Sequence, residues 1–351
     1  MKEYNKKLKI ALIMCCFLIG ILSISVQASQ NQGDPLSSDY ETRQTILIQG
    51  DGQFGPENGV RSGSGTPEDP FIIEGWDIDP IAGGINIQQT SKHVVIRNNR
   101  ITTDVELTGI GILGPAENIV VKNNIIDVGG LGIYVSNSWE IDIIGNEILG
   151  TNEGERGIKV HTSENGTITN NIIANMELSA VWLSAVGYWE IEENVFFEPE
   201  REAVYLSGDD VLKSNNISIA YNNFIQCEEY YSITPDNDGR NNSLYDGENR
   251  RGNYYSDYQA RYPDATNNGV YWDTPVTISD FDIRDNYPLV EPTVEIPDYL
   301  SWEEETTPRD DLENDENDTE VDEPFVIYGY PLAFLLVGFS AAALVLMKHH
   351  E

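Results

Sequence analysis

Aromatic and cationic residues recur at one position in a series of short β-branched segments. The second residues of these segments are Asn86, Gly111, Tyr134, Lys159, Trp182 and Tyr205, and His161 is a fourth residue. If the segments stack as parallel strands, neighbours in this column lie about 4.8 Å apart. Aromatic faces flanked by a cation and hydroxyls suit the mixed apolar and polar faces of a sugar ring. We therefore predict that Tyr134, Lys159, His161, Trp182 and Tyr205 bind a glycan. The alternative is an aromatic column that only covers the sheet.

A second group of residues could support catalysis. Glycosidases use two carboxylates at a set separation, one with a raised pKa, and Asp142, Glu190 and Glu192 are the candidates here. Polysaccharide lyases instead need a base near an acidic sugar, commonly with Ca²⁺, and Arg156, Lys159 and His161 form a small basic cluster. Outward carboxylates on strands are usually only solvated, so an enzyme is the alternative to a binding protein. If the protein is a lyase, calcium is the cofactor that we expect; otherwise we expect none.

Soft metal ligands are scattered. Copper requires clustered His, Met or Cys side chains, but His93, His161, Met176 and Cys227 fall in different repeats without ligand spacing. We therefore predict no metal site. Cys227 is the single cysteine beyond the leader, which excludes a disulfide framework and predicts a small buried residue.

The elements that position these groups follow from a phrase that occurs six times: two or three β-branched residues, polar residues, an asparagine and an apolar residue. The recurring asparagines are Asn99, Asn124, Asn146, Asn171, Asn194 and Asn222, at intervals of 22 to 28 residues. Such a period is typical of a solenoid, here a right-handed parallel β-helix of the all-β class. We expect each asparagine to occupy a corner with φ > 0 and to form a side-chain ladder with its neighbours. The apolar residue two places later should enter the core.

Both ends of the chain differ from this repeat. Residues 1–28 combine four lysines, an apolar run and a small-residue cleavage site after Ala28, which predicts a secretory signal peptide; a retained anchor is the alternative. Residues 29–290 are the expected ectodomain. Tyr254, Tyr255, Tyr258, Tyr271 and Trp272 should cap its last coil.

Residues 291–324 hold 15 acidic residues and a single arginine, which predicts an extended, solvated stalk. Residues 325–347 are apolar and long enough to cross a bilayer, with a buried core helix as the alternative. Lys348 follows, so residues 348–351 should be a cytoplasmic tail. The net charge of −37 excludes a typical nucleic-acid binder. Four N-x-S/T sequons begin at Asn165, Asn216, Asn241 and Asn317, which makes glycosylation feasible.

Three stretches carry a resemblance to a known family: Gly50-Asp51-Gly52-Gln53-Phe54, the run Gly63–Ile78, and the closing segment that includes Gly252–Tyr258 and Asp285–Val290. With the repeats, they resemble NosD-like right-handed parallel β-helix proteins with CASH-type repeats, over about residues 46–290. Stalked, C-terminally anchored versions look similar to archaeal cell-surface proteins.

The resemblance implies two further associations. The family's namesake is a periplasmic protein linked to copper delivery to nitrous oxide reductase, and the repeat also occurs in carbohydrate-binding and sugar-hydrolysing proteins. The sequence therefore predicts a membrane-anchored cell-surface protein that binds glycans or envelope proteins without catalysis. A carbohydrate-active enzyme and a copper-maturation accessory protein are the alternatives.

Overall fold

A computed structural model describes residues 40–79, 83–103, 107–151, 154–208, 212–233, 241–277 and 283–300. The signal peptide and the membrane helix predicted from the sequence lie outside these residues. Most of the predicted stalk also lies outside them. Within the described ranges, no helix has the length and apolar character needed to cross a membrane.

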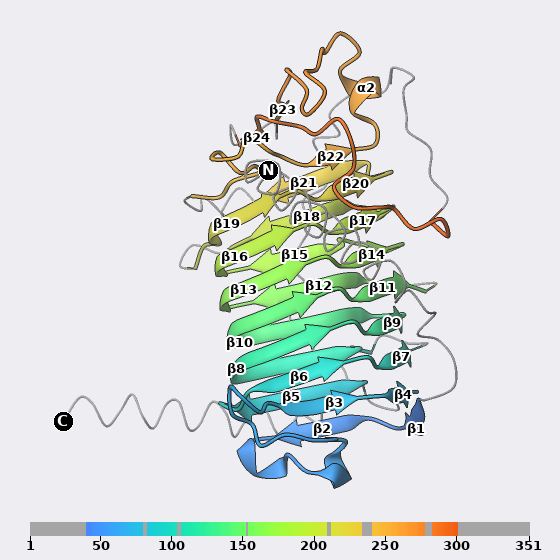
Figure 1. Cartoon of the computed structure of the whole chain (residues 1–351), viewed down its shortest axis with the longest axis vertical. Coiled ribbons are helices and arrows are strands. Elements are labelled where there is room, and N and C mark those ends of the chain that lie inside the picture. The colour runs from blue at the N-terminus through green and yellow to red at the C-terminus, as the bar shows by residue number, and fades with distance from the viewer. Residues whose placement is uncertain are drawn as a thin grey trace, which may run out of the picture. The chain divides into compact units, whose positions relative to one another are not determined.

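The chain forms a parallel β-helix whose coils stack along one axis (Figure 1). One thirteen-stranded sheet bends into two faces, because β8 (Ile110–Lys122) and β10 (Leu131–Ile144) each run across both. Face A holds the first halves of these two strands with β2 (Ile46–Gln49), β5 (Ile85–Thr90), β12 (Arg156–His161), β15 (Val181–Ser184), β18 (Glu202–Ser207) and β21 (Glu229–Ile233). Face B holds their second halves with β3 (Phe71–Glu74), β6 (Val94–Arg97), β13 (Glu164–Thr169), β16 (Gly187–Glu192) and β19 (Asn215–Ala220).

A nine-stranded parallel sheet closes each coil as face C. Its strands are β1 (Glu41–Arg43), β4 (Trp76–Ile78), β7 (Arg100–Thr103), β9 (Ile125–Val128), β11 (Glu147–Gly150), β14 (Ile172–Ala174), β17 (Val195–Phe197), β20 (Asn223–Ile225) and β22 (Tyr254–Tyr255). Short 3₁₀ turns η1 (Asp51–Gln53) and η2 (Pro56–Asn58) lie at the N-terminal end. The C-terminal end carries α2 (Tyr258–Arg261), β23 (Val276–Thr277) and β24 (Arg284–Asp285).

The alternation predicted from the sequence builds the core. The residues two places after the ladder asparagines are fully buried, as predicted: Ile101, Ile126, Ile148, Ile173, Phe196 and Phe224. The first and third residues of the face A segments are also buried, so one aliphatic column runs through the stacked coils. Burying this column is the main contribution to stability, since no single coil could enclose it.

The asparagine ladder is present and runs in one direction. The side-chain oxygen of Asn124 accepts from the backbone N–H and the amide Nδ2 of Asn99, at 3.1 and 3.0 Å. The same pair of bonds joins each following step. The ladder asparagines are at most 1% exposed. Each therefore satisfies buried backbone groups that the corner would otherwise leave unpaired.

The prediction that the ladder asparagine itself has φ > 0 was wrong by one position. Left-handed φ values belong to the residue that precedes each ladder position, such as Asn98 at 49°, Asn123 at 53° and Asn170 at 57°. Glu193 and Tyr221 adopt the same conformation in later coils. The preceding residue makes the bend, and this turns the ladder asparagine inward toward the next coil.

The ladder continues beyond the predicted positions and ends on a carboxylate. Asn222 donates to Asn253 through its backbone N–H and amide, and Asn253 N donates to Asp285 Oδ2 at 2.7 Å. Tyr255 also donates to that oxygen at 3.0 Å. A Cβ at Gly252 would lie 1.8 Å from Asp285 Oδ1, so only glycine allows this approach. Asn253, Tyr255 and Tyr287 all donate to Asp285, so an acceptor-only carboxylate suits the end of the ladder.

The C-terminal aromatic residues cap the last coil as predicted. Tyr254, Tyr255, Tyr258 and Trp272 are nearly fully buried, and Tyr258 stacks on Trp272 with ring centroids 4.9 Å apart. Cys227 is buried beneath this end, also as predicted, and burial raises the pKa of its thiol.

Residues 291–300 do not belong to a solvated stalk. They return along the outer side of face C (Figure 1), where Ile296 and Leu300 pack with Val195, Phe197 and Ile225. Thr293 and Asn223 exchange two hydrogen bonds of 2.7 Å. We call residues 289–300 the strap. Apolar residues on the outer side of face C explain why this part of the acidic segment is ordered.

The ladder predicts different effects at two adjacent asparagines. Asn171→Ala removes an acceptor of two bonds and a donor of two or more, and orphaned buried groups each cost about 1–3 kcal/mol. We expect urea denaturation to show a loss of at least about 2 kcal/mol. Asn170→Gly, at an exposed left-handed residue, should change stability by less than about 1 kcal/mol. Equal losses would contradict the ladder's role.

The ladder terminus predicts a pH dependence. Burial raises the pKa of Asp285 to about 6, above the value of roughly 3.9 in an unfolded chain. The folded protein therefore retains a proton that the unfolded chain releases between about pH 4 and pH 6. Stability from this group is complete below pH 4 and declines by about 3 kcal/mol as the pH rises through 6.

Thermal unfolding of the wild type and of Asp285→Asn across this pH range measures the effect. As the pH rises through 6, the wild type should lose stability relative to Asp285→Asn. A constant difference would show that Asp285 titrates normally.

Candidate functional site

The predicted aromatic column lies on face A in the expected register. Tyr134, Lys159, Trp182 and Tyr205 are direct Cα partners on β10, β12, β15 and β18. His161 pairs with Ser136 and Ser184 in the neighbouring outward column. Alternation turns all these side chains away from the core, because their flanking residues point inward.

Trp182 is the centre of the column. The Lys159 Nζ atom lies 3.8 Å from the Trp182 ring centroid, and the Arg156 Cζ atom lies 4.3 Å from it. The Tyr205 ring is 5.8 Å away and tilted by 35°. The indole N–H donates to Ser207 Oγ at 2.7 Å. These contacts fix one rotamer of Trp182 before any ligand arrives, which lowers the entropy lost on binding.

The arrangement differs from a row of open ring faces. The neighbours of Trp182 along the axis are Lys159 and Tyr205, so its faces are used within the column. Trp182, Lys159 and His161 are half-buried, whereas Tyr134 and Tyr205 are only 6% and 8% exposed. Burial also raises the pKa of Tyr134. Arg156 is also buried, and it pairs with Glu155 at 2.8 Å. The surface therefore offers ring edges, alkyl stems, the Lys159 ammonium and hydroxyls.

The carboxylate candidates lie on face B. Asp142, Thr167, Glu190 and Ser218 form one outward column, which puts Asp142 and Glu190 two coils, or about 9.6 Å, apart. Thr167 Oγ1 donates to Asp142 Oδ1 at 2.8 Å, between the two carboxylates. The column faces a different side of the β-helix from Trp182. The structure thus separates the predicted catalytic and ligand-binding residues.

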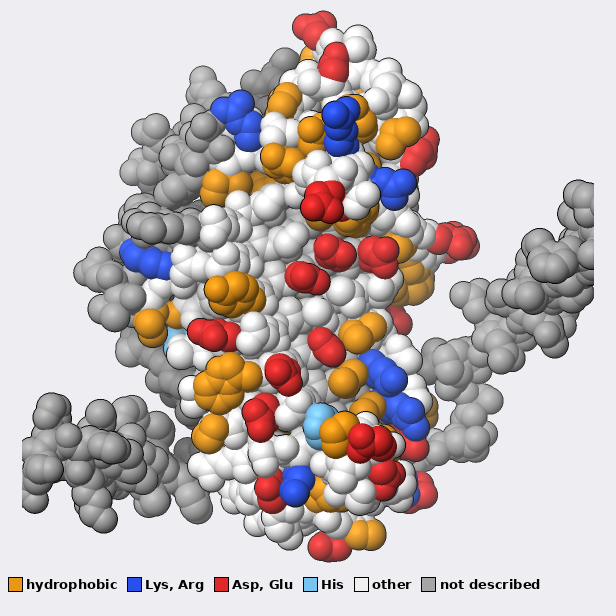
Figure 2. Space-filling view, turned by 60° about the vertical axis from the view of Figure 1, so that its left-hand side comes forward, with side chains coloured by type: hydrophobic (Ala, Val, Ile, Leu, Met, Phe, Trp, Pro, Cys, Tyr) orange, Lys and Arg blue, Asp and Glu red, His pale blue; other side chains and the backbone are white. Residues whose placement is uncertain are grey.

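Glu192 lies near three other carboxylates, and Figure 2 shows acidic side chains gathered on one side of the molecule. Partial burial raises the pKa of Glu192, and the charges of Glu190, Glu193 and Asp246 raise it further. Hydrogen bonds from Asn249 and Tyr221 lower the pKa of Asp246. Asp246 could not be predicted from the sequence, because it follows the last repeat and approaches Glu192 only through the coil stacking.

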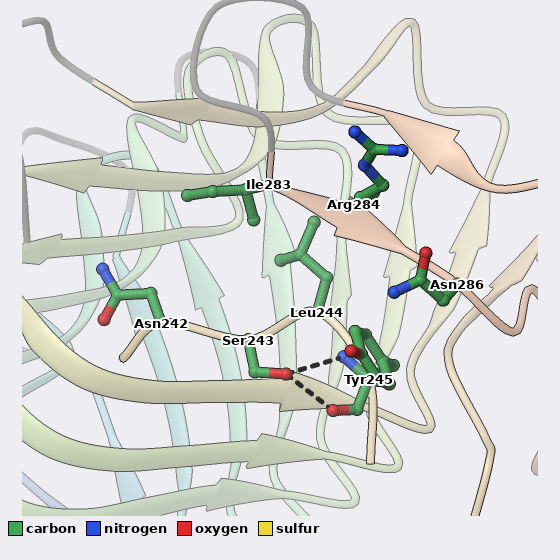
Figure 3. Close-up of a pocket in the computed structure, with 7 residues that line it drawn as sticks. All are labelled: Asn242, Ser243, Leu244, Tyr245, Ile283, Arg284 and Asn286. Carbon is green, nitrogen blue, oxygen red and sulfur yellow. Dashed lines mark hydrogen bonds between the residues drawn. The ribbon is translucent and has the colours of Figure 1, made fainter. Parts of the chain in front are cut away.

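A cavity of 440 Å³ lies at the C-terminal end and was not predicted from the sequence (Figure 3). The residues that line it are Asn242, Ser243, Leu244, Tyr245, Ile283, Arg284 and Asn286. It forms between the end of face B and β24, which lie about 40 residues apart in the chain. Ser243 Oγ donates to Tyr245 O at 2.7 Å, and the Asn242 amide bonds Ile217 N and Ser214 O. These polar groups therefore stabilise local structure.

Metal ligands do not converge in the part of the chain that the structure describes. No group of three or more His, Cys, Asp or Glu side chains there has the geometry to hold an ion. His93 lies at the corner before β6, and His161 ends β12 three coils further along the axis, so the two do not come together.

Comparison with known proteins gives a family and a fold. Residues 62–246 match the family described as the right handed beta helix region. The A-module of a mannuronan C-5 epimerase from Azotobacter vinelandii aligns at 17% identity and a TM-score of 0.41, covering 62% of this chain and 74% of that one. Dettilon tailspike protein aligns at 15% identity and a TM-score of 0.41, covering 68% of this chain and 54% of the tailspike. The periplasmic alginate epimerase aligns at 11% identity and a TM-score of 0.30, covering 59% and 68%. A search of curated proteins finds no match. Likeness at these identities concerns the fold alone.

The acidic surface predicts a measurable coupling. Because the charge of Glu190 raises the pKa of Glu192, Glu190→Gln should lower that pKa, while burial keeps it above the ordinary value. Carbon NMR titration of labelled glutamate carboxyls would measure the change. The matched change Glu164→Gln, at another exposed glutamate of face B, should leave Glu192 unaffected. An unchanged pKa in Glu190→Gln would show that the two carboxylates do not interact.

Proposed function

The chain belongs to the right handed beta helix family, and we propose that its face A is a non-catalytic glycan-binding surface displayed outside the cell. The observation that carries this proposal is the ordered column around Trp182. An aromatic residue fixed by a hydrogen bond, with the Lys159 ammonium over its ring, suits saccharides, which combine apolar C–H faces with hydroxyls.

The location outside the cell rests on the sequence. A signal peptide over residues 1–28 would direct export, and an apolar helix over residues 325–347 would retain the protein in the membrane. The remaining acidic segment, from residue 301 to 324, would hold the β-helix away from the bilayer. The NosD-like resemblance, with its archaeal cell-surface relatives, is consistent with this arrangement.

One observation favours a carbohydrate-active enzyme as the second candidate. Asp142 and Glu190 share a column, and their backbone positions lie about 9.6 Å apart. This spacing is close to the upper limit for the separation of the two carboxyl groups in an inverting glycosidase. Nearby Glu192 has the raised pKa that a general acid needs. However, Thr167 occupies the space between the pair and bonds Asp142. A copper-maturation role has no comparable support, because His93 and His161 lie three coils apart.

A glycan array tests the proposal with residues 29–300, a fragment that keeps the strap. Trp182→Ala should abolish or weaken binding at least tenfold, because it removes the ring that Arg156, Lys159 and Tyr205 all contact. Trp139→Ala is the matched control, since Trp139 is 37% exposed at the corner between faces A and B. Equal loss in both variants, or no binding by the folded wild type, would refute the proposal. Turnover of a bound glycan that is lost in Glu190→Gln would favour the enzyme.

A further inference from the structure

The corner between faces A and B carries a second column of left-handed residues. Asn118, Glu140, Asn165, Tyr188 and Asn216 all have φ between 55° and 61° and occupy equivalent positions in successive coils. Asn241 extends the column with φ 60°, and its amide donates to Asn216 Oδ1 at 3.0 Å. We call this column the AB edge. Its side chains point outward, unlike those of the buried asparagine ladder.

Three sequons coincide with the AB edge. They are Asn165-Gly166-Thr167, Asn216-Ile217-Ser218 and Asn241-Asn242-Ser243. Their hydroxyl residues also share one outward column, because Thr167 and Ser218 both pair with Glu190, and Ser218 bridges Ser243. Every sequon within the described ranges therefore occupies the same position of its coil, whereas chance would scatter them around the coil.

Architecture accounts for only part of this pattern. A left-handed corner favours asparagine, and an outward strand position two residues later accepts serine or threonine. Yet the AB edge also holds Glu140 and Tyr188, and Asn118 is followed by Val120 at the hydroxyl position. The corner therefore requires neither the asparagine nor the hydroxyl, and their coincidence three times needs a further cause.

We propose that the AB edge is a site of N-linked glycosylation at Asn165, Asn216 and Asn241. The reaction transfers an oligosaccharide from a lipid-linked pyrophosphate donor. The bond from sugar C1 to phosphate oxygen breaks, a bond from C1 to asparagine Nδ2 forms, the amide loses one proton, and the lipid pyrophosphate leaves. This inference rests on export of the ectodomain, which is part of the proposed function.

Exposure and spacing set the expected occupancy. Asn165 and Asn241 are exposed, and Asn216 is half-buried. Asn165 and Asn216 lie two coils, or about 9.6 Å, apart, so both can carry a glycan. Asn216 and Asn241 are one coil apart and share a hydrogen bond, so their glycans would crowd each other. We expect full occupancy at Asn165 and about one glycan per molecule at the other two.

Tyr188 lies between the first two sites. It pairs in register between Asn165 and Asn216, and it is 60% exposed. A left-handed conformation is costly for a bulky residue, so an exposed tyrosine there is unusual. Its ring is within reach of the first sugar on either neighbour, where stacking would offset the exposed apolar area.

Glycopeptide mass spectrometry of the full chain, purified from its native cells, tests the inference. The expected result is a glycan on the Asn165 peptide and partial occupancy at Asn216 and Asn241. The Asn118 peptide, at the same edge but without a hydroxyl at Val120, should be unmodified. Bare peptides at all three sequons would overturn the inference.

Matched variants separate the sequon from the fold. Thr167→Val should remove the glycan at Asn165, whereas Thr167→Ser should retain it, since only the first loses the hydroxyl. Val120→Thr should add one glycan, at Asn118. Retention of the glycan in Thr167→Val, or no gain in Val120→Thr, would contradict sequon-directed glycosylation of this edge.

Labelling intact cells with a membrane-impermeant reagent separates this inference from the proposed function. A labelled chain with bare sequons would overturn the glycosylation alone. An unlabelled chain with bare sequons would overturn both the export and the glycosylation.

Discussion

The buried asparagine ladder is the constraint on which the rest of the molecule depends. Each side chain satisfies a backbone N–H and an amide N–H of the preceding coil, in a corner that no strand partner reaches. Because every step donates in the same direction, the chain of amide dipoles needs an acceptor at its end, and Asp285 supplies it. Burial resists the charge of that carboxylate, so the cap and the ladder form one coupled unit.

The ladder also determines what each face can present. It fixes the register of the coils, so that residues about 25 positions apart become neighbours in straight outward columns. A single substitution changes one member of a column and leaves the backbone unaltered, as the sequence Asp142, Thr167, Glu190 and Ser218 illustrates. Function in such a fold therefore lies in the columns, and the scaffold says little about which function it is.

Sequence patterns predicted this scaffold well, because period and alternation are local properties. The ladder positions, the core residues and the register of Tyr134, Lys159, Trp182 and Tyr205 could all be predicted. The left-handed residue was misplaced by one, since asparagine occurs at both positions in three coils. The cavity near Leu244 and the contact of Asp246 with Glu192 depend on how the cap folds back, which no repeat encodes. The strap was missed because acidic composition concealed a few apolar residues such as Ile296.

The three faces leave different surfaces for a partner. Apolar outward residues of face C, including Phe197 and Ile225, are covered by the strap over the C-terminal coils. Face B carries the carboxylates around Glu190, which repel anionic partners. Face A differs, because the Lys159 ammonium lies over the half-buried ring of Trp182, with the Tyr205 ring beside it. Arg156 contacts the same ring but is buried and pairs with Glu155, much as Arg43 and Arg61 pack on the buried Trp76. The partly exposed cation and aromatic rings are the features on which the proposed glycan binding depends, and they make face A the strongest candidate for binding.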